Sequence, residues 1–432
     1  MTRGTWGAIP VALMLLQAVG PALAEGGSTP ADARVRAAQL LLRRHPLDAR
    51  AHHQLGDAYV QKARETGDAK YFTLAEEALR KAIAIEPQSS GAIRHLAYVL
   101  YSRHAFQEAS AEAEKAIAMD PTDSHALGIL GDAQLEVGRY AEAKRTYQRM
   151  IALDEGLYAL SRRAGLRSVR GDVEGAVADL ERAIEDGKAT GRPAESVAWV
   201  QWQLATEHWN VGRLDAAEAG YQAALATYPG YHRALAGLAH VRAAQGRSDE
   251  AVALYRRAIE VVPQPDYVAA LGDLLSRTGR HEEARRQYEL VEYIGRLSAL
   301  NQALYNRELA SFYLDHDTQL DAALALARRE LEIRRDVYAH DLLAWALYKN
   351  GQPDAAREAM AEALREGTRD ARLFFHAGMI ERTLGNATGA ARYLRLALDT
   401  NPHFHPLHAD EARRVLDALA DPAATVMSGV AP

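Results

Sequence analysis

The sequence predicts an all-α solenoid, in which one helix-turn-helix unit is stacked about ten times along a single axis. Three observations support this prediction: a recurrence with a fixed period of 34 residues, a large-small residue pair in unit after unit, and a helix-favouring composition. Alanine, leucine, arginine and glutamate dominate the 432 residues, and only 15 prolines interrupt them. Such an array grows along one axis, so its length does not imply several globular domains.

The recurrence is a pattern of small residues, a larger apolar residue and a proline that returns after 34 residues. The matched sets are Ala75, Leu79, Ala82 and Pro87 with Ala109, Ala113, Ala116 and Pro121, and Ala217, Tyr221, Ala224 and Pro229 with Ala251, Tyr255, Ala258 and Pro263. A period of this length is typical of a two-helix repeat. The alanines and the tyrosine fall at i, i+4 and i+7, so they form one apolar stripe on the second helix of the unit.

The first helix of each unit carries a large residue followed by a small one. These pairs are Leu55-Gly56, Leu96-Ala97, Leu130-Gly131, Leu204-Ala205, Leu238-Ala239, Leu271-Gly272 and Leu343-Ala344. The small residue allows the second helix to approach closely, and the large one fills the space beside it. Turns such as Gly138-Arg139 and Gly246-Arg247 then end the first helix, because glycine readily adopts the conformation that is needed there.

Four stretches depart from the pattern. Extra residues around Glu65 to Tyr71 should lengthen one hairpin, and Arg162-Arg163-Ala164 stands where a large-small pair is expected. The stretch Gly187 to Pro193 is rich in helix breakers and is the best candidate for a hinge. Between Gly295 and Leu320 the register slips by about five residues.

These units resemble tetratricopeptide repeats, whose pattern is a large-small pair, an aromatic residue or leucine, then alanine, aromatic, alanine and proline. The resemblance extends from Asp32 to Ala420 and implies a right-handed superhelix with half-units at its ends, Asp32–Arg44 and His408–Ala420. The organisation that we expect is a signal peptide over 1–24, a short linker over 25–31, an N-terminal array over 32–187, a C-terminal array over 188–407 that continues the same solenoid, a capping helix over 408–421 and a disordered tail over 422–432.

The N-terminus has the features of an export signal. Arg3 precedes a short apolar run from Ile9 to Val19, and Ala22-Leu23-Ala24 provides a small-x-small cleavage pattern. Cleavage after Ala24 would leave a chain that starts at Glu25, is periplasmic or secreted, and has no stable insertion in a membrane. An uncleaved anchor is the alternative, although the apolar run is shorter than the roughly 20 residues that span a bilayer.

Composition and motifs exclude several classes of function. The net charge of -6 argues against a nucleic-acid partner. The absence of cysteine excludes disulfides, thiol nucleophiles and cysteine-ligated metals. There is no nucleophile elbow, phosphate-binding glycine loop or zinc-protease helix, so we expect neither catalysis nor a cofactor.

In this family the concave groove is lined by first-helix residues that lie one and four positions after the small anchor, and three and six before it. The resemblance therefore implies a partner-binding groove with Arg94, Tyr98, Tyr101, Trp199, Trp202, Trp209, Tyr338, Asp341, Trp345 and Tyr348. Four of the five tryptophans of the chain fall on these positions. Aromatic residues provide a large contact area at a small cost in entropy, but this stripe could instead pack on Tyr228 and Tyr231.

Charged residues give weaker signals. The groove positions offer mainly Arg94 as a cation, so the sequence does not predict a clamp for a peptide carboxylate. Asp57, Asp132 and Asp273 would favour basic or neutral segments, although solvated helix faces explain them equally well. The run containing His403, His405 and His408 is a weak metal-site candidate, and a connecting loop is its alternative interpretation.

Taken together, these observations predict a non-enzymatic adaptor of the cell envelope that binds a segment of another protein in its concave groove. The alternative is a periplasmic accessory protein that binds a small ligand or a metal, using the aromatic groove or the C-terminal histidines.

Overall fold

The computed structural model describes residues 30–66, 68–300 and 306–420, which form 22 α-helices and no strand. Ten pairs follow one another: α3 (Ala49–Thr66) with α4 (Lys70–Ile85), α5 (Ser90–Ser102) with α6 (Phe106–Met119), α7 (Ser124–Glu136) with α8 (Tyr140–Leu153), α9 (Leu157–Val169) with α10 (Val173–Ala189), α11 (Ala194–Asn210) with α12 (Leu214–Thr227), α13 (His232–Ala244) with α14 (Ser248–Val261), α15 (Pro265–Arg277) with α16 (His281–Leu300), α17 (Asn306–Asp315) with α18 (Leu320–Ile333), α19 (Val337–Lys349) with α20 (Pro353–Ala363), and α21 (Ala371–Thr383) with α22 (Ala387–Thr400). A single helix precedes the pairs, α2 (Pro30–Arg44), and another follows them, α23 (His408–Ala420).

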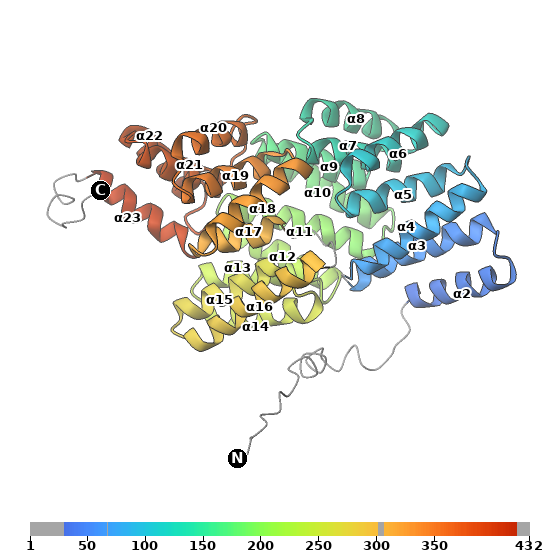
Figure 1. Ribbon diagram of the computed structural model, residues 1–432, viewed down its shortest axis with the longest axis horizontal. Coiled ribbons are helices and arrows are strands. Elements are labelled where there is room, and N and C mark those ends of the chain that lie inside the picture. The colour runs from blue at the N-terminus through green and yellow to red at the C-terminus, as the bar shows by residue number, and fades with distance from the viewer. Residues whose placement is uncertain (1–29, 67, 301–305, 421–432) are drawn as a thin grey trace, which may run out of the picture.

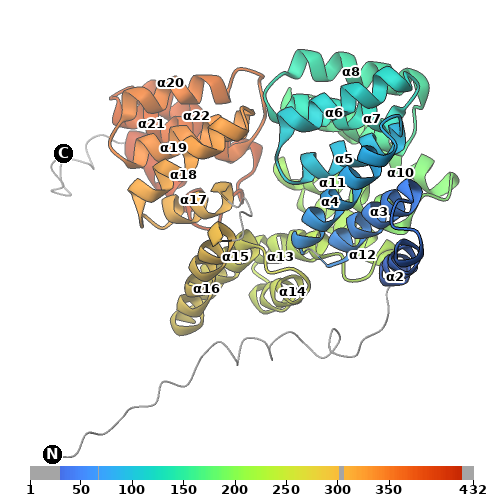
Figure 2. The ribbon, with the colours of Figure 1, turned by 45° about the vertical axis from the view of Figure 1, so that its right-hand side comes forward.

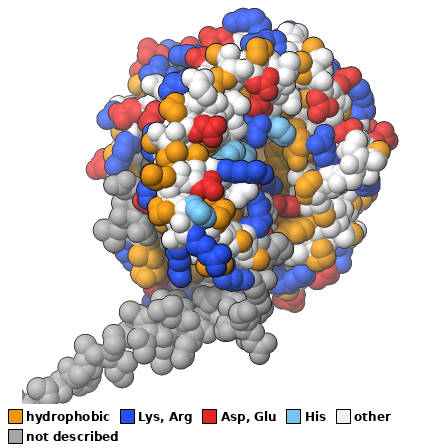
Figure 3. Space-filling view, turned by 90° about the vertical axis from the view of Figure 1, so that its right-hand side faces the viewer, with side chains coloured by type: hydrophobic (Ala, Val, Ile, Leu, Met, Phe, Trp, Pro, Cys, Tyr) orange, Lys and Arg blue, Asp and Glu red, His pale blue; other side chains and the backbone are white. Residues whose placement is uncertain are grey.

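Consecutive helices pack on one another along the whole array, so the predicted all-α solenoid of about ten units with half-units at its ends is confirmed. First helices of neighbouring units also touch, for example α5 with α7 and α19 with α21, and they form the inner layer (Figure 1). The end of the array nearest to α2 carries a hollow bordered by hydrophobic, basic and histidine side chains (Figure 3).

The large-small pairs act as the sequence predicts. A Cβ atom added to Gly131 would lie 2.3 Å from Cε1 of Tyr147, and one added to Gly272 would lie 2.5 Å from Cε1 of Tyr288. The second-helix alanines are fully buried, with 0% exposure at Ala143. Small residues therefore set the distance between the two helices of a unit.

The superhelix closes on itself. Figure 2 shows two lobes, one containing α3 to α11 and the other α17 to α22, joined below by α12 to α16. Hydrogen bonds join the lobes: the backbone N–H of Val337 donates to the Tyr140 hydroxyl at 2.8 Å, and that of Arg335 donates to the carbonyl of Glu136 at 3.0 Å. The Asn401 side chain donates to the carbonyl of Trp209 at 2.7 Å. The concave surface is therefore enclosed, with repeats about 200 residues apart in direct contact.

One of the irregular stretches differs from expectation. Helix α10 continues through Gly187 to Ala189, so only 190–193 connect it to α11, and the expected boundary at 187/188 falls inside a helix. The reason is packing, because a Cβ on Gly187 would lie 2.3 Å from Cδ1 of Leu157. The extra residues after Gly56 lengthen α3 to 18 residues, so they lengthen this hairpin, as the sequence predicts.

The unit with Arg162 and Arg163 folds normally because both charges find partners. Arg162 Nε donates to Asp132 at 2.9 Å, and Arg163 Nη2 donates to Asp179 at 2.6 Å. The expected register slip coincides with the long α16 and with 301–305, outside the described residues.

The expected signal peptide and tail also lie outside the described residues. None of the described helices combines the length and apolar character that crossing a bilayer requires.

Candidate functional site

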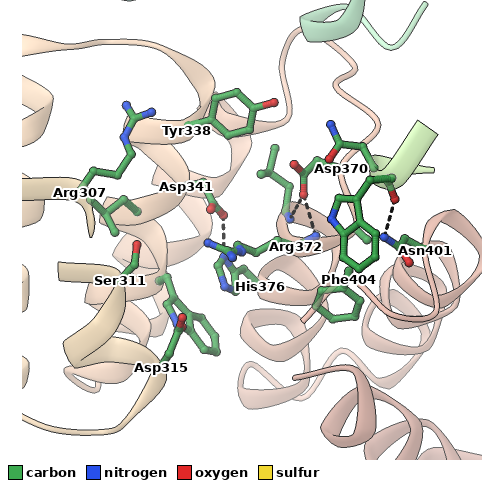
Figure 4. A pocket seen from close by; sticks show the side chains of 16 residues that line it. Arg307, Ser311, Asp315, Tyr338, Asp341, Asp370, Arg372, His376, Asn401 and Phe404 are labelled. Carbon is green, nitrogen blue, oxygen red and sulfur yellow. Dashed lines mark hydrogen bonds and ion pairs between the residues drawn. The ribbon is translucent and has the colours of Figure 1, made fainter. Parts of the chain in front are cut away.

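Closure of the superhelix creates a cavity with two adjoining chambers of about 260 and 420 Å³. The first chamber lies between the end of α11, the helices α17, α19 and α21, and the segment after α22 (Figure 4). The second extends along α13, α15 and α17 towards the start of α23. The chambers share Trp209, Arg307, Ser311, Asp315, Arg372 and Phe404. Volumes of this size suit a few amino-acid side chains or a small ligand.

Contacts between distant units build the first chamber. Asn401, which is 1% exposed, holds the end of α11 and so fixes Trp209 opposite α19 and α21. Asp370 caps α21, because its carboxylate accepts the backbone N–H of Arg372 at 2.8 Å. This cap places the Arg372 side chain in the chamber (Figure 4).

Histidine-aspartate pairs line both chambers of the cavity. His376 Nδ1 lies 2.8 Å from Asp341, and His316 Nε2 lies 2.8 Å from Asp273. Burial opposes protonation of His316, but the hydrogen bond to Asp273, the charges of Asp273 and Asp315, and the hydrogen bond to the backbone of Phe312 together outweigh it. The pKa of this histidine is therefore raised. The carboxylates of Asp341 and Asp273 are therefore already hydrogen-bonded to histidines of the chain.

The second chamber contains two carboxylates without a cation. Asp266 lines the chamber although the residue is exposed, and Glu308 is half-buried. Partial desolvation and the charge of Glu308 raise the pKa of Asp266, and burial raises the pKa of Glu308. Neither side chain forms an ion pair with the described residues. Carboxylates with raised pKa in a cavity are candidates for a binding site.

Four of the predicted groove residues come together in the first chamber: Trp209, Tyr338, Asp341 and Trp345. Trp345 forms part of the wall rather than a free surface. It is 2% exposed and stacks between Tyr348 and His376, with ring centroids 4.8 and 4.2 Å away.

The other predicted groove residues lie elsewhere. Trp199 and Trp202 are half-buried against the core cluster that contains Tyr231, and the Arg233 guanidinium lies 5.1 Å from the Trp202 ring. Near the N-terminus, Arg94 forms an ion pair with Asp123 at 3.1 Å. Close by, Tyr98 packs on the same core as Tyr101, whose hydroxyl donates to Glu136 at 3.3 Å.

The three acidic groove candidates are all engaged within the chain. Asp57 forms an ion pair with Arg34, and Asp132 accepts from the Tyr147 hydroxyl at 2.8 Å as well as from Arg162. Asp273 accepts from the Tyr288 hydroxyl at 3.0 Å in addition to its pair with His316. Their charges therefore do not form an open acidic stripe.

Of the C-terminal histidines, His405 and His408 meet Asp315, and ligand atoms of the three residues lie within 4.8 Å of one another. His405 Nδ1 accepts the backbone N–H groups of Leu407 and His408, at 3.2 and 3.4 Å. The neutral His405 ring then carries its proton on Nε2, which faces Asp315 at 3.4 Å. A metal ion would have to displace that proton, so this arrangement fits a cap for α23 better than a metal site.

Sequence reasoning missed Arg372, His376 and Phe404. The signal for Arg372 was present, since it lies six residues before Gly378 and a Cβ at Gly378 would lie 2.8 Å from Leu394. The residue before Gly378 is Ala377 instead of a large residue, so the large-small pair that marks the other anchors is missing here. Phe404 lies outside a helix and enters the cavity only through closure.

A solenoid of stacked helix pairs, each packed on its neighbours, defines a repeat protein. Family models of the tetratricopeptide repeat match residues 100–161, 210–274 and 342–403, so the chain contains tetratricopeptide repeats, as predicted. Repeats of this family generally mediate protein-protein interactions. The comparison with curated proteins returns no match.

Several solved structures are similar to the chain. A human IFIT1 dimer with PPP-AAAA is 15% identical with a TM-score of 0.49, and the match covers 74% of this chain and 73% of that one. The APC/C hetero-tetramer Cut9-Hcn1 is 14% identical with a TM-score of 0.34 and coverages of 95% and 94%. YrrB, described as a tetratricopeptide protein with an unusual peptide-binding site, is 21% identical with a TM-score of 0.29 and coverages of 44% and 94%.

Proposed function

We propose that this protein is a non-enzymatic interaction adaptor of the cell envelope, and that its enclosed cavity holds a segment of a partner protein. The observation that carries the proposal is the cavity itself, which combines the aromatic walls of Trp209, Tyr338 and Phe404 with charges that have no partner. Aromatic side chains provide contact area, and charges in an enclosed site select the partner.

The second chamber favours a basic or neutral segment. The charge of Glu308 disfavours ionisation of Asp266, and neither carboxylate forms an ion pair with a described residue. A lysine or arginine from a partner would relieve this repulsion. A small ligand in the same cavity is the second candidate.

The envelope location rests on the N-terminal sequence, with its apolar run from Ile9 to Val19 and the small residues around Ala24. If the signal peptide is cleaved, the mature chain acts in the periplasm or is secreted. The location is tested by fractionating cells that express the tagged full chain and sequencing the N-terminus of the mature protein; an N-terminus other than Glu25, or retention in the cytoplasm, would contradict it.

Site-specific photo-crosslinking tests the adaptor function. A photoreactive phenylalanine analogue at Phe404 or Tyr338, inside the cavity, should capture one defined protein segment in native cells. The same analogue at Tyr293, which is 41% exposed on α16, should not capture it. Capture should also fall in the double variant Asp266→Asn/Glu308→Gln. Equal capture at all three positions would contradict binding in the cavity.

A further inference from the structure

Two histidines from neighbouring first helices meet near the N-terminal end of the array. His53 lies on α3 and His95 on α5, and these two helices pack on each other. Nε2 of His53 is 2.8 Å from Nδ1 of His95, and the ring centroids are 4.9 Å apart. Both side chains are half-buried, so the helices hold the pair in place while solvent still reaches it. Neither histidine lines the two chambers, so the pair is separate from the cavity.

Gly91 makes room for this pair. It lies on α5 one turn before His95, and therefore on the same face of the helix. A Cβ added to Gly91 would lie 3.2 Å from Cε1 of His53. A larger residue at this position would press on the His53 ring, so the glycine allows that ring to reach His95.

No further partner fixes the tautomer of either imidazole. A neutral histidine carries one ring N–H and one acceptor nitrogen. Nδ1 of His53 and Nε2 of His95 form no hydrogen bond with a described residue, so either ring can carry its proton there. His405 differs, because two backbone N–H groups hold its Nδ1. In the pair, both facing nitrogens can therefore present lone pairs, and rotation about the soft χ2 torsions turns them towards one ion.

The charge around the pair suits a bound cation. Burial lowers the pKa of both rings, that of His95 to about 4, and neutral imidazole is the form that binds metal ions. Asp57 follows His53 by one turn of α3, and its negative charge acts on both rings although it also pairs with Arg34. Arg94 acts in the opposite sense, but its guanidinium is already engaged in an ion pair.

We propose that His53 and His95 chelate one divalent transition-metal ion, Cu²⁺ or Ni²⁺. Metal–nitrogen bonds of about 2.0 Å place two nitrogens that are 2.8 Å apart at an angle of about 90° around the ion. This angle joins adjacent corners of a square-planar or tetragonal complex, the geometry typical of Cu²⁺ and Ni²⁺ with nitrogen and oxygen ligands. The tetrahedral geometry of Zn²⁺ would require a separation of about 3.3 Å. Water would complete the coordination, and the proposal goes beyond the adaptor function without depending on it.

Calorimetric titration of the protein with CuCl2, NiCl2 or ZnCl2, in a buffer that does not bind metals, measures the binding. The tightest site should take up one Cu²⁺ per chain, with Ni²⁺ and then Zn²⁺ bound more weakly. Electron spin echo envelope modulation of the protein with one equivalent of Cu²⁺ counts the coordinated imidazoles. We expect two imidazoles in the unchanged protein and fewer when either histidine is replaced.

Single substitutions assign the site. Loss of a residue that only supports a metal ligand already costs about 10–100-fold in affinity, so His53→Gln and His95→Gln should each weaken Cu²⁺ binding by about tenfold or more. His281→Gln removes an exposed histidine at the start of α16 and should leave the binding unchanged. His405→Gln/His408→Gln removes the C-terminal histidine pair and should retain it as well. Melting curves without metal report whether each variant is folded.

Tight binding of Cu²⁺ retained in folded His53→Gln/His95→Gln would overturn the proposal, as would a loss of binding in His405→Gln/His408→Gln instead. Binding of Zn²⁺ as tight as that of Cu²⁺ would contradict the geometry, and a single coordinated imidazole would contradict chelation by the pair. The titration needs no partner and the site lies outside the cavity. Its failure is therefore distinct from failure of crosslinking at Phe404 and Tyr338, which would contradict the adaptor function.

Discussion

At the scale of single residues, side-chain volume at the anchor positions controls how the two helices of a unit pack. The ring of Tyr147 lies directly against Gly131, and it cannot turn away freely because its hydroxyl donates to Asp132. We therefore expect Gly131→Ala to destabilise the protein by about 1–3 kcal/mol, since overpacking a tight interface displaces side chains. Urea denaturation at neutral pH measures this change.

Gly165 provides the matched control for Gly131→Ala. It lies inside α9, and a Cβ added there would meet nothing within 4 Å. Gly165→Ala should therefore stabilise the protein by about 0.5–1 kcal/mol, because alanine favours the helix over the unfolded chain. Equal effects of the two substitutions would show that the close approach of Tyr147 does not matter.

His240 is expected to make the protein less stable in acid. Burial, together with the charges of His405 and Arg372, lowers the pKa of His240 to about 4, whereas the unfolded chain titrates near 6.5. As the pH falls from 6.5 to 4, the unfolded state binds the proton first. The stabilisation present above pH 6.5 is therefore lost in this window, by about 1–2 kcal/mol at pH 5.

The variant His240→Phe isolates this contribution. Phenylalanine keeps an aromatic ring against Trp209 and Tyr255 but cannot be protonated. The loss of unfolding free energy between pH 7.5 and 5 should be smaller in this variant by the stated amount. The exposed control His45→Gln should retain the full pH dependence. Comparison with the unchanged protein is necessary because Asp266, with its raised pKa, shifts stability in the opposite direction.

At the scale of elements, a glycine predicts a break in a helix, but it can instead lie within the helix and allow a neighbouring side chain to approach closely. Gly187 lies within α10 and against Leu157, so its role is close approach rather than bending. We expect the amides of 187–189 to exchange with deuterium as slowly as those in the middle of α10, and much more slowly than those of 190–193. Fast exchange from residue 187 onwards would restore the hinge interpretation.

The elements themselves were largely predictable because their signals are local. The pairs such as Leu130-Gly131 and the alanine stripes act within one unit, so the helices, their order and the α23 cap follow from spacing alone. The Arg162 unit was misjudged because its charges are satisfied by Asp132 and Asp179 on neighbouring helices. Such pairing depends on tertiary contacts that no local pattern contains.

At the scale of the whole molecule, the candidate site depends on closure, which the repeat pattern does not encode. Trp209 and Tyr338 were predicted separately as groove residues, but their position across one chamber requires the bond between Asn401 and the end of α11. A one-dimensional repeat specifies contacts between neighbours only. Small rotations accumulated over many units decide which distant turns meet, and with them the shape of the cavity.

Closure can be tested with glycines in equivalent turns. Gly138 has a φ of +74°, and a Cβ on it would lie 2.3 Å from the carbonyl oxygen of Arg335 in the opposite lobe. Gly171 has a φ of +73°, and its Cβ would lie 2.4 Å from the carbonyl oxygen of Gly367, also in the opposite lobe. Gly246 and Gly279 have similar φ values, +76° and +79°, but nothing lies within 4 Å of an added Cβ. Alanine at any of the four strains the turn by about 1–2 kcal/mol. Only the first two substitutions also push the lobes apart.

We therefore expect Gly138→Ala/Gly171→Ala to open the superhelix, and Gly246→Ala/Gly279→Ala to lose similar stability without opening it. Small-angle X-ray scattering should show a larger radius of gyration for the first double variant alone. The first variant should also lose crosslinking at Phe404 and Tyr338, because separation of the lobes moves Trp209 away from Tyr338. An equal radius of gyration in both variants would mean that these turns do not hold the lobes together.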